Sequence, residues 1–373
     1  MPDLFKDKKI AIIHYWWISN RGGESVISSL CNIFPEADLF FHVCDEPKVR
    51  NKLGSNFKGN IHKTIISKLP FAKKHYQKYL PFMPFALESL DLSDYDIVIS
   101  SEAGPTKGVI TKPDCIHFCY CHSPMRYIWD MGHEYTRNMG VIKKLLFRII
   151  SHKLRIWDIT SVPRVDHFIS NSSFIKKRIT KFYKRDSKVI HPPIAVKNFN
   201  HQRKRKEFYL CLGQLVPYKR IDMAIDAFND LGIELVVIGE GEQFKYLSQI
   251  KKNNICLLGR QDFSVVKEYL ETCKALIFPG IEDFGIVPVE ASAAGAPVIG
   301  FNGGGIRDTV LHGKNGILYE KQTKEHLINA VQAYEKKKFV FDSDEISEYA
   351  KKFDIEVFES EIKNFIHAKL KEV

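Results

Sequence analysis

The sequence has no long hydrophobic run and no apolar leader. It contains no stretch of about 18 uncharged apolar residues, and the segment 1–9 lacks the apolar core of a signal peptide. These absences argue against a membrane-spanning helix and against secretion, so we expect a cytoplasmic protein. Low-complexity tracts are missing too. The 45% hydrophobic content and 12% aromatic residues are typical of a packed chain, and 373 residues are enough for two domains.

The eight cysteines do not form a metal-binding pattern. They are scattered, mostly within apolar runs, and show no repeated pair spacing of the kind found in zinc sites. We therefore expect reduced, buried thiols, with a metal site at Cys119 and Cys121, which would share one face of a strand, as the alternative. The triplet Asp94-Tyr95-Asp96 has the Asp-x-Asp form of metal-dependent enzymes, but a second such triplet at 342–344 indicates a chance pattern. The sequence predicts no metal.

Positive charge is concentrated in the first half of the chain. Residues 1–200 contain 31 Lys and Arg against 18 Asp and Glu, a balance of +13, whereas residues 201–373 contain 24 against 26, a balance of −2. Such a bias suits contact with an anionic surface, whether phospholipid, a diphosphate-linked lipid or nucleic acid. Charge alone leaves these partners open.

Short apolar runs alternate with amphipathic stretches in two successive sets, which is the βαβ pattern of parallel sheets. They predict strands at 10–14, 39–43, 97–100, 116–121 and 167–170, and then at 208–212, 234–238, 255–258, 275–278 and 297–299. Prolines, asparagines and a basic run at 192–206 indicate a linker. We therefore predict an α/β protein with two Rossmann-like domains, 1–191 and 207–352, facing each other across a cleft, and a closing helix within 353–373.

Two glutamates flank a strand-to-helix turn in the second predicted domain. Glu282 follows the predicted strand 275–278, and Glu290 lies in a short helix with a proline in its first turn and a glycine at its end. Gly285 between them lets the backbone approach a neighbour closely. A carboxylate at this edge of a sheet can accept hydrogen bonds from neighbouring sugar hydroxyls. The segment resembles the signature of the family-4 retaining glycosyltransferases, in which two such glutamates hold a nucleotide sugar.

The resemblance extends to the loop 213–222, which follows the first strand of the second domain. It places Lys219 on the position of a lysine that contacts the donor diphosphate, where a fixed cation stabilises the charge of the leaving group. The family usually has Arg where this chain has Gln214, and Arg220 is a candidate to supply the missing charge. The alternative is a solvated Lys-Arg pair beside a helix start. With Gly285 and the two glutamates, these residues form the predicted donor site.

Two segments of the first domain carry further candidates. The pair Gly22-Gly23 opens a helix, so donor phosphate can approach amide groups at its positive end, although such glycines often only shape a turn. The strand 116–121 ends at His122, which matches the family's donor-sugar histidine; a structural histidine is the alternative. Arg126 is a candidate for contact with an acceptor phosphate, or else a solvated surface residue.

Two glycine-rich segments of the second domain need separate interpretations. Residues 239–244 imitate a dinucleotide fingerprint, but Phe244 stands where the third glycine should be, which disfavours a nicotinamide enzyme. Residues 301–310 follow a predicted strand and precede a helix. The resemblance implies that their exposed amides line the donor site.

Two basic stretches of the first domain are amphipathic. Residues 141–155 predict a helix with apolar residues on one side and Lys144, Arg148 and Arg155 around them, and residues 63–79 mix lysines with aromatic residues. Both can rest on an anionic leaflet, where each nearby cation adds about 1 kcal/mol. The alternative is an ordinary packed helix with a solvated basic face.

The resemblance covers nearly the whole chain and is closest to bacterial mannosyltransferases of O-antigen and exopolysaccharide assembly. It implies a GT-B architecture whose closing helix can cross back onto the first domain. It also implies GDP-mannose as donor, no cofactor, and a polyprenyl-diphosphate-linked glycan acceptor at the inner face of the cell membrane, with no nucleic acid partner.

The resemblance further implies a mechanism. Retention ordinarily needs a nucleophile on the far face of the sugar, and the sequence shows no convincing one. We therefore expect same-face substitution, in which the leaving diphosphate helps to take the acceptor's proton, with His122, Lys219 and Glu282 as catalytic residues. A nucleotide-sugar epimerase of the same architecture and a non-catalytic lipid- or nucleic-acid-binding protein are the alternatives.

Overall fold

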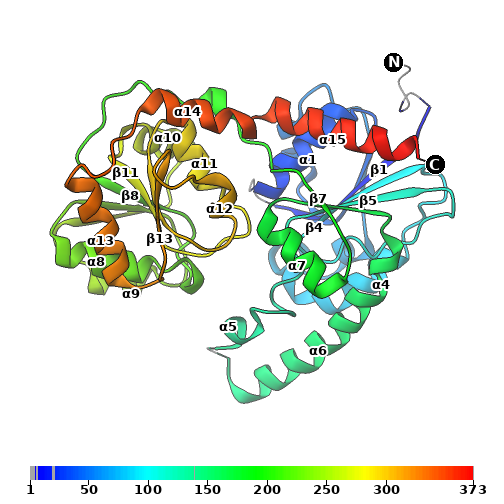
Figure 1. Cartoon of the computed structure of the whole chain (residues 1–373). Coiled ribbons are helices and arrows are strands. Elements are labelled where there is room, and N and C mark those ends of the chain that lie inside the picture. The colour runs from blue at the N-terminus through cyan, green and yellow to red at the C-terminus, as the bar shows by residue number, and fades with distance from the viewer. Residues whose placement is uncertain (1–4, 6, 19–21, 138, 373) are drawn as a thin grey trace. The chain divides into compact units, whose positions relative to one another are not determined.

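The chain forms two compact units, each built on one parallel sheet. The computed structural model describes residues 5, 7–18, 22–137 and 139–372. The first unit comprises residues 1–192 and 358–373, and the second comprises residues 193–357. Helices cover both faces of each sheet, which confirms the predicted α/β class (Figure 1).

The first sheet has seven strands in the order β3-β2-β1-β4-β5-β6-β7, and its neighbouring strands all pair in parallel. The strands are β1 (Ile10–Trp17), β2 (Asp38–Cys44), β3 (Ile61–Lys63), β4 (Ile97–Glu102), β5 (Ile116–Cys121), β6 (His167–Ser170) and β7 (Lys188–Val189). Every residue of β2 and of β4 is buried, because helices cover both faces. The two short edge strands, β3 and β7, were not predicted, since neither contains a buried residue that would mark it in the sequence.

The helices of the first unit vary in length from one turn to twenty residues. They are α1 (Gly22–Ile33), α2 (Glu46–Leu53), α3 (Ala72–His75), α4 (Met83–Glu88), α5 (Gly132–Thr136), α6 (Val141–Thr160), α7 (Ser173–Tyr183) and the 3₁₀ helices η1 (Ile65–Lys68), η2 (Tyr76–Phe82) and η3 (Val162–Arg164). The final helix, α15 (Ile355–Leu370), begins in the second unit and continues into the first.

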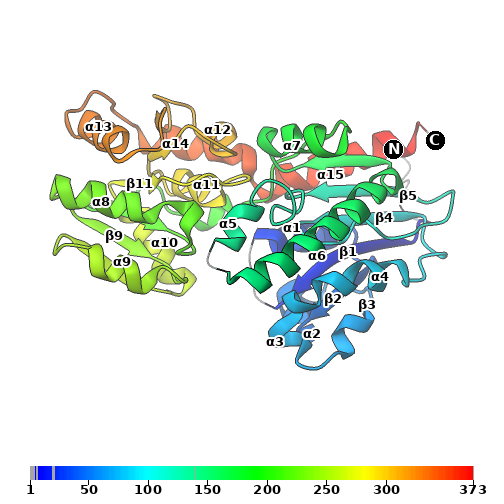
Figure 2. The ribbon, with the colours of Figure 1, turned by 90° about the horizontal axis from the view of Figure 1, so that it is seen from below.

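The core of the first unit lies on both sides of its sheet. On one side, α1 packs together with Phe358, Ile362 and Ile366 of α15. Asn32 Nδ2 of α1 also donates a hydrogen bond to Glu359 Oε1 at 2.9 Å. The other side carries α6 and α7, and Figure 2 shows α6 running across this face of the sheet. The closing helix therefore completes the core of the first unit.

The second sheet has six strands in the order β10-β9-β8-β11-β12-β13, again all parallel. The strands are β8 (Tyr209–Leu212), β9 (Leu235–Ile238), β10 (Ile255–Gly259), β11 (Ala275–Phe278), β12 (Val298–Phe301) and β13 (Gly316–Tyr319). The helices are α8 (Ile221–Leu231), α9 (Phe244–Ile250), α10 (Phe263–Thr272), α11 (Ile286–Ala293), α12 (Ile306–Thr309), α13 (Lys324–Glu335), α14 (Ser343–Ala350), and the 3₁₀ helices η4 (Val196–Asn198), η5 (Pro217–Lys219) and η6 (Lys351–Phe353).

The segment expected to be a linker, 192–206, contributes to the core of the second unit. Ile194, Val196 and Phe199 are buried there with residues of α10, α11 and α14. The backbone amide of Ile194 also bonds to the carbonyl of Phe353 at 2.9 Å. The prolines and basic residues around these three apolar side chains hide them in the sequence. The exposed residues of the segment are all polar: Lys197, Asn198, Asn200, Gln202, Arg203, Lys204 and Lys206.

Strand order reverses once in each sheet. In the first sheet the reversal falls between β1 and β4, and in the second between β8 and β11. Loops that leave two such neighbouring strands run in opposite directions and open a crevice at the carboxyl ends of the strands. The candidate residues of each unit follow these four strands or their neighbours.

Candidate active site

The loop after β8 presents Lys219 at the reversal point of the second sheet. Gly213 follows the strand with a φ of 144°, and a Cβ atom on it would lie 2.8 Å from Lys219 Nζ. Glycine therefore leaves the space that the lysine side chain occupies. Lys219 Nζ forms an ion pair with Glu282 Oε1 at 2.7 Å, and the two side chains are only 14% and 21% exposed. Two predicted site residues are thus in direct contact.

The loops after β11 and β12 close around the same ion pair. A Cβ atom on Gly280 would lie 2.7 Å from Lys219 Cα, so this glycine allows the β11 loop to approach η5. The backbone of Glu282 pairs with that of Gly304 in a parallel β-bridge, and the Glu282 carbonyl accepts a hydrogen bond from the amide of Gly305 at 2.8 Å. Backbone contacts thereby fix the position of Glu282. Three loops from three strands meet at one point.

Glu290 lies on α11, one helical turn beyond Gly285. Gly285 is the N-cap of this helix with a φ of 90°, a conformation that favours glycine. The Glu290 side chain is partly buried, and burial raises its pKa from 4.5 to about 7. Burial disfavours the ionised form of this carboxyl group, so hydroxyl donors would stabilise that form, and a ribose or hexose can provide them.

The remaining donor-site candidates lie on the same loop as Lys219. Arg220 has a φ of 53°, a strained value for a residue other than glycine, and such values often occur at functional sites. Its Nε lies 3.5 Å from Asp222 Oδ1 at the start of α8, so part of its charge is already balanced. Gln214 is exposed. Whether Arg220 compensates for Gln214 remains a prediction.

The dinucleotide-like glycines after β9 have a packing role. A Cβ atom on Gly239 would lie 1.8 Å from the carbonyl oxygen of Gly213, and one on Gly241 would lie 2.3 Å from that of Leu215. Both glycines therefore allow the β9 loop to pack against the β8 loop. They support the loop that carries Lys219.

In the first unit, His122 lies just after β5 and is bonded to a serine on β4. Ser101 Oγ lies 2.8 Å from His122 Nε2 and 3.0 Å from His14 Nδ1 on β1. Burial lowers the pKa of His122 to about 4 and that of His14 well below its usual value, so both rings are neutral near pH 7. Gly23 of α1 lies beside His14, because a Cβ atom on this glycine would lie 3.3 Å from His14 Cε1. Gly22 and Gly23 form the first turn of α1; residues 19–21 of this motif lie outside the described residues.

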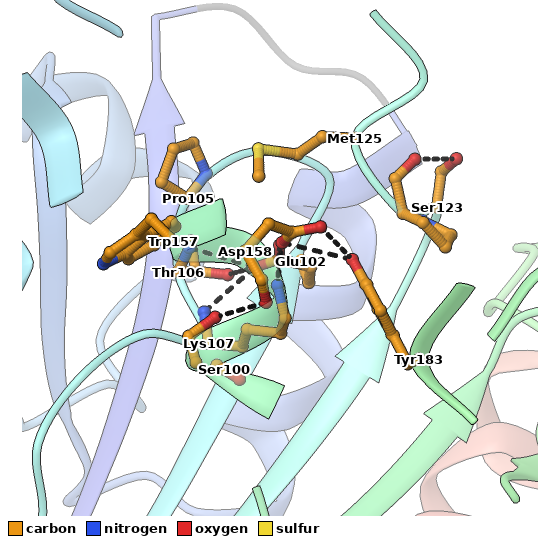
Figure 3. A network of polar contacts seen from close by, with 12 residues as sticks. Ser100, Glu102, Pro105, Thr106, Lys107, Ser123, Met125, Trp157, Asp158 and Tyr183 are labelled. Atoms are coloured by element: carbon orange, nitrogen blue, oxygen red, sulfur yellow. Dashed lines mark hydrogen bonds and ion pairs between the residues drawn. The ribbon is translucent and has the colours of Figure 1, made fainter. Parts of the chain in front are cut away.

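A buried ion network holds the end of β4 beside His122. Lys107 Nζ contacts both Glu102, with 3.4 Å to Oε1, and Asp158 of α6, and all three side chains are fully buried (Figure 3). Burial alone would lower the pKa of Lys107, but the two carboxylates raise it above its usual value. The Glu102 carbonyl accepts a hydrogen bond from the His122 amide at 2.8 Å. The network therefore joins α6 to the strand end that positions His122.

Sequence reasoning did not identify the partners of His122. His14, Ser101, Glu102 and Lys107 were not singled out as site residues. One signal was available, because Ser100-Ser101-Glu102 interrupts the apolar run of β4 at its carboxyl end, where α/β proteins place their sites.

Arg126 follows β5 and is partly buried, and its carbonyl accepts a hydrogen bond from the amide of Met131 at 3.0 Å.

The residues weighed as metal ligands have other partners. Asp94 Oδ2 accepts a hydrogen bond from Lys9 Nζ at 3.1 Å, and Asp96 Oδ1 accepts one from Lys112 Nζ at 3.3 Å. The eight cysteines are free thiols, all buried except Cys256. In the described part of the chain, no group of three or more His, Cys, Asp or Glu side chains is arranged to hold a metal ion.

Two family models match the chain in succession. The model for Glycosyltransferase Family 4 matches residues 20–198, and the model for Glycosyl transferases group 1 matches residues 195–353. The chain belongs to glycosyltransferase family 4. Both halves of this family-4 glycosyltransferase thus contribute to the assignment, and each match contains the candidate residues of its own unit.

Curated proteins resemble parts of this family-4 chain. The uncharacterized glycosyltransferase MJ1178 of Methanocaldococcus jannaschii is 32% identical over 200 residues, which are 51% of this chain and 56% of that protein. The O-antigen chain mannosyltransferase RfbU of Salmonella typhimurium is 28% identical over 170 residues, 42% of this chain and 46% of RfbU. The aligned region therefore spans only about half the length of these curated relatives.

Solved structures share the fold over nearly the whole length. The lipopolysaccharide outer core galactosyltransferase WaaB superposes with a TM-score of 0.67 at 18% identity, covering 97% of this chain and 99% of WaaB. Anabaena Alr3699/HepE in complex with UDP gives a TM-score of 0.69 at 16% identity, covering 96% and 100%. These likenesses confirm the predicted fold of two Rossmann-like domains, the GT-B fold, for this family-4 glycosyltransferase.

Proposed function

We propose that this chain is a retaining, metal-independent hexosyltransferase that transfers mannose from GDP-mannose to a polyprenyl-diphosphate-linked glycan in surface polysaccharide synthesis. The observation that carries the proposal is the ion pair of Lys219 and Glu282, with Glu290 on the following helix, at the reversal point of the second sheet. A cation and two carboxyl groups in one loop cluster match the two halves of a nucleotide sugar, its diphosphate and its hydroxyls.

The ion pair gives both residues a defined role in the reaction. Without donor, Glu282 balances Lys219 at 2.7 Å. A bound diphosphate takes over this role, so Lys219 stabilises the leaving group and Glu282 becomes free to accept hydrogen bonds from the sugar. Glu290 accepts hydrogen bonds from the ribose. His122 of the first unit orients the hexose.

The chemical step is a substitution at the anomeric carbon. The bond to the diphosphate oxygen breaks, and a new bond to the acceptor hydroxyl oxygen forms on the same face of the sugar. The acceptor proton passes to the leaving diphosphate, whose developing charge Lys219 and the amides of Gly22 and Gly23 stabilise. Arg126 is assigned to the phosphate of the acceptor.

The choice of GDP-mannose rests on named relatives. Besides RfbU, they include an α-1,3/1,6-mannosyltransferase of Dictyostelium discoideum, 26% identical over 257 residues. A GDP-mannose-dependent mannosyltransferase of Mycobacterium tuberculosis is 28% identical over 140 residues. The structural neighbour Alr3699/HepE instead binds UDP and UDP-glucose. A panel of nucleotide sugars therefore decides the donor.

Thermal shift is the first test of the donor. A ligand present at 100 times its Kd stabilises the folded chain by about 2.7 kcal/mol. We expect GDP-mannose to raise the Tm, and UDP-glucose, UDP-galactose and UDP-N-acetylglucosamine to have a smaller effect. Turnover is then measured as mannose incorporation into a polyprenyl-diphosphate-linked acceptor. Donor consumption without acceptor would instead favour the epimerase, and no response to any nucleotide sugar would overturn the proposal.

The same proposal places the chain at an anionic membrane surface, and α6 supports it. Val141 and Ile142 are 86% and 84% exposed, and Leu145, Leu146 and Ile149 are at least half exposed. Helix α6 carries five Lys and Arg and a single acidic residue, the buried Asp158. Figure 1 shows the N-terminal half of α6 extending beyond the strands of the first sheet. This half of α6 is therefore not the ordinary packed helix weighed as the alternative.

A second exposed segment adjoins α6. Phe71, Phe82 and Phe85 are 79%, 61% and 66% exposed, and the sequence has lysines but no acidic residue between Glu46 and Glu88. Leu80 packs with residues of α6, so the two segments are neighbours. No described helix is long and apolar enough to cross a membrane. Exposed apolar side chains among cations suit binding to the surface of an anionic leaflet.

Vesicle sedimentation tests the membrane surface. We expect the chain to bind vesicles with anionic lipid more strongly than pure phosphatidylcholine vesicles, and high salt to weaken binding. Ile142→Glu should reduce binding at least tenfold, because it places a charge in the interface. Val340→Glu is the matched control, since Val340 is 83% exposed in the second unit. Equal loss in both variants, or no vesicle binding by the unmodified chain, would contradict this placement.

A further inference from the structure

Two histidines of the first unit share one serine hydroxyl. His14 on β1 is fully buried, and its Nδ1 lies 3.0 Å from Ser101 Oγ on β4. The same oxygen lies 2.8 Å from Nε2 of His122 after β5. The pairing of β1 with β4 places His14 directly beside Ser101. The strands themselves therefore build this contact.

The number of protons restricts the arrangement. Each neutral imidazole carries one N–H, and Ser101 has one O–H. His14 Nε2 is buried and has no hydrogen-bond partner among the described residues. A buried N–H without a partner is rarer than an unpaired acceptor, so the proton of His14 belongs on Nδ1, where it is donated to Ser101 Oγ. The serine hydroxyl is then free to donate to His122 Nε2.

This chain of donors leaves the proton of His122 on Nδ1. We propose that Ser101 and His14 are positioning residues that hold His122 as the Nδ1–H tautomer, so that Nδ1 donates a hydrogen bond to a hydroxyl oxygen of the bound sugar. The role toward the sugar rests on the proposed function. The tautomer itself depends only on the contacts within the first unit.

The unit also contains reference histidines whose tautomers are set by carbonyl groups. His117 Nδ1 lies 2.9 Å from the carbonyl oxygen of Arg164, so its proton is on Nδ1, and its Nε2 accepts from Ser100 at 2.8 Å. His42 Nε2 lies 3.0 Å from the carbonyl oxygen of Pro105, so its proton is on Nε2. These residues provide one internal standard for each tautomer.

Ring nitrogen shifts of ¹⁵N-histidine-labelled protein test the tautomer directly. With signals assigned from His14→Gln and His122→Gln variants, we expect His122 and His14 to match His117 and to differ from His42. Ser101→Ala should move His122 toward the Nε2–H form, and Ser101→Thr, which keeps the hydroxyl, should restore Nδ1–H. An Nε2–H signal for His122 in the unmodified protein overturns the proposal. So does an unchanged signal in Ser101→Ala.

Kinetics test the role toward the sugar. Ser101→Ala should lower kcat/KM by about tenfold, the effect of one weakened hydrogen bond, and Ser101→Thr should recover most of it. Ser100→Ala is the matched control, because it removes the equivalent serine from His117 and should leave both kcat/KM and the His122 signal unchanged. A tautomer change without any loss of activity overturns the role toward the sugar. If the chain transfers no sugar at all, the proposed function fails while the nitrogen shifts still decide the tautomer.

Discussion

Replacement of Glu290 by Gln should stabilise the second unit at alkaline pH and weaken donor binding at the same time. Burial raises the pKa of Glu290 from 4.5 to about 7. This rise corresponds to about 3 kcal/mol by which the fold disfavours the ionised form. The folded state therefore holds the proton more tightly than the unfolded state between pH 4.5 and 7. The contribution of Glu290 to stability is therefore greatest below pH 4.5 and is lost as the pH rises through 7.

Gln at position 290 cannot ionise, so the variant should lose this pH dependence. At pH 8 we expect the free energy of unfolding of the second unit to exceed that of the unmodified chain by up to about 3 kcal/mol, and at pH 5 by much less. Donor affinity should fall by about 1.5–3 kcal/mol, because hydrogen bonds to a charged carboxylate are replaced by weaker ones to an amide. Gain of stability with loss of affinity is the distinguishing result.

The distribution of tryptophans makes the measurement specific. All four, Trp16, Trp17, Trp129 and Trp157, lie in the first unit. Urea unfolding followed by tryptophan fluorescence thus reports the first unit, and circular dichroism reports both. Only the dichroism transition should shift in Glu290→Gln, and the exposed Glu234→Gln serves as control. The reasoning is refuted if the free energy of unfolding of Glu290→Gln changes between pH 5 and pH 8 by as much as that of the unmodified chain.

Three further outcomes follow from the contacts described. Lys219→Ala should remove about 3 kcal/mol of transition-state stabilisation, the size of one lost oxyanion donor, and kcat should fall accordingly. Steady-state turnover measures this, and near-normal turnover would refute the assigned role. Lys107→Met should destabilise the first unit by about 3–5 kcal/mol, because two carboxylates stay buried without their cation; an unshifted fluorescence transition in urea would contradict this. Donor binding at pH 7 should release roughly half a proton, because hydroxyl donors lower the pKa of Glu290. Calorimetry in buffers of different ionisation enthalpy measures this proton release. A binding enthalpy that does not depend on the buffer would exclude it.

The sequence by itself was sufficient for the architecture. Strands buried on both faces appear as short apolar runs, and amphipathic helices between them have a different period, so most strands of both sheets could be predicted from local pattern. The short edge strands β3 and β7 could not, since they bury too little apolar surface. The edge strand β13 of the second sheet was also not predicted, although most of its residues are buried. The linker was misplaced, because Ile194, Val196 and Phe199 enter the second core from a segment of polar composition.

Part of the candidate site was equally accessible from local motifs. Glu282 and Glu290 were found from their place around a strand-to-helix turn, and Lys219 from its resemblance to a family motif. The ion pair between Lys219 and Glu282 was not predictable, because it depends on the close approach of two loops that glycines permit.

Local sequence determined the strands, the helices and the positions of the polar residues at strand ends, because short-range sterics and hydrophobic periodicity act within a few residues. Tertiary structure alone decided that Ser101 joins His14 to His122 and that Lys107 meets Asp158, 51 positions away. It also decided which apolar side chains of α6 stay exposed. The physical reason is that strand order, register and helix packing bring distant residues together, and each of these depends on the whole unit at once.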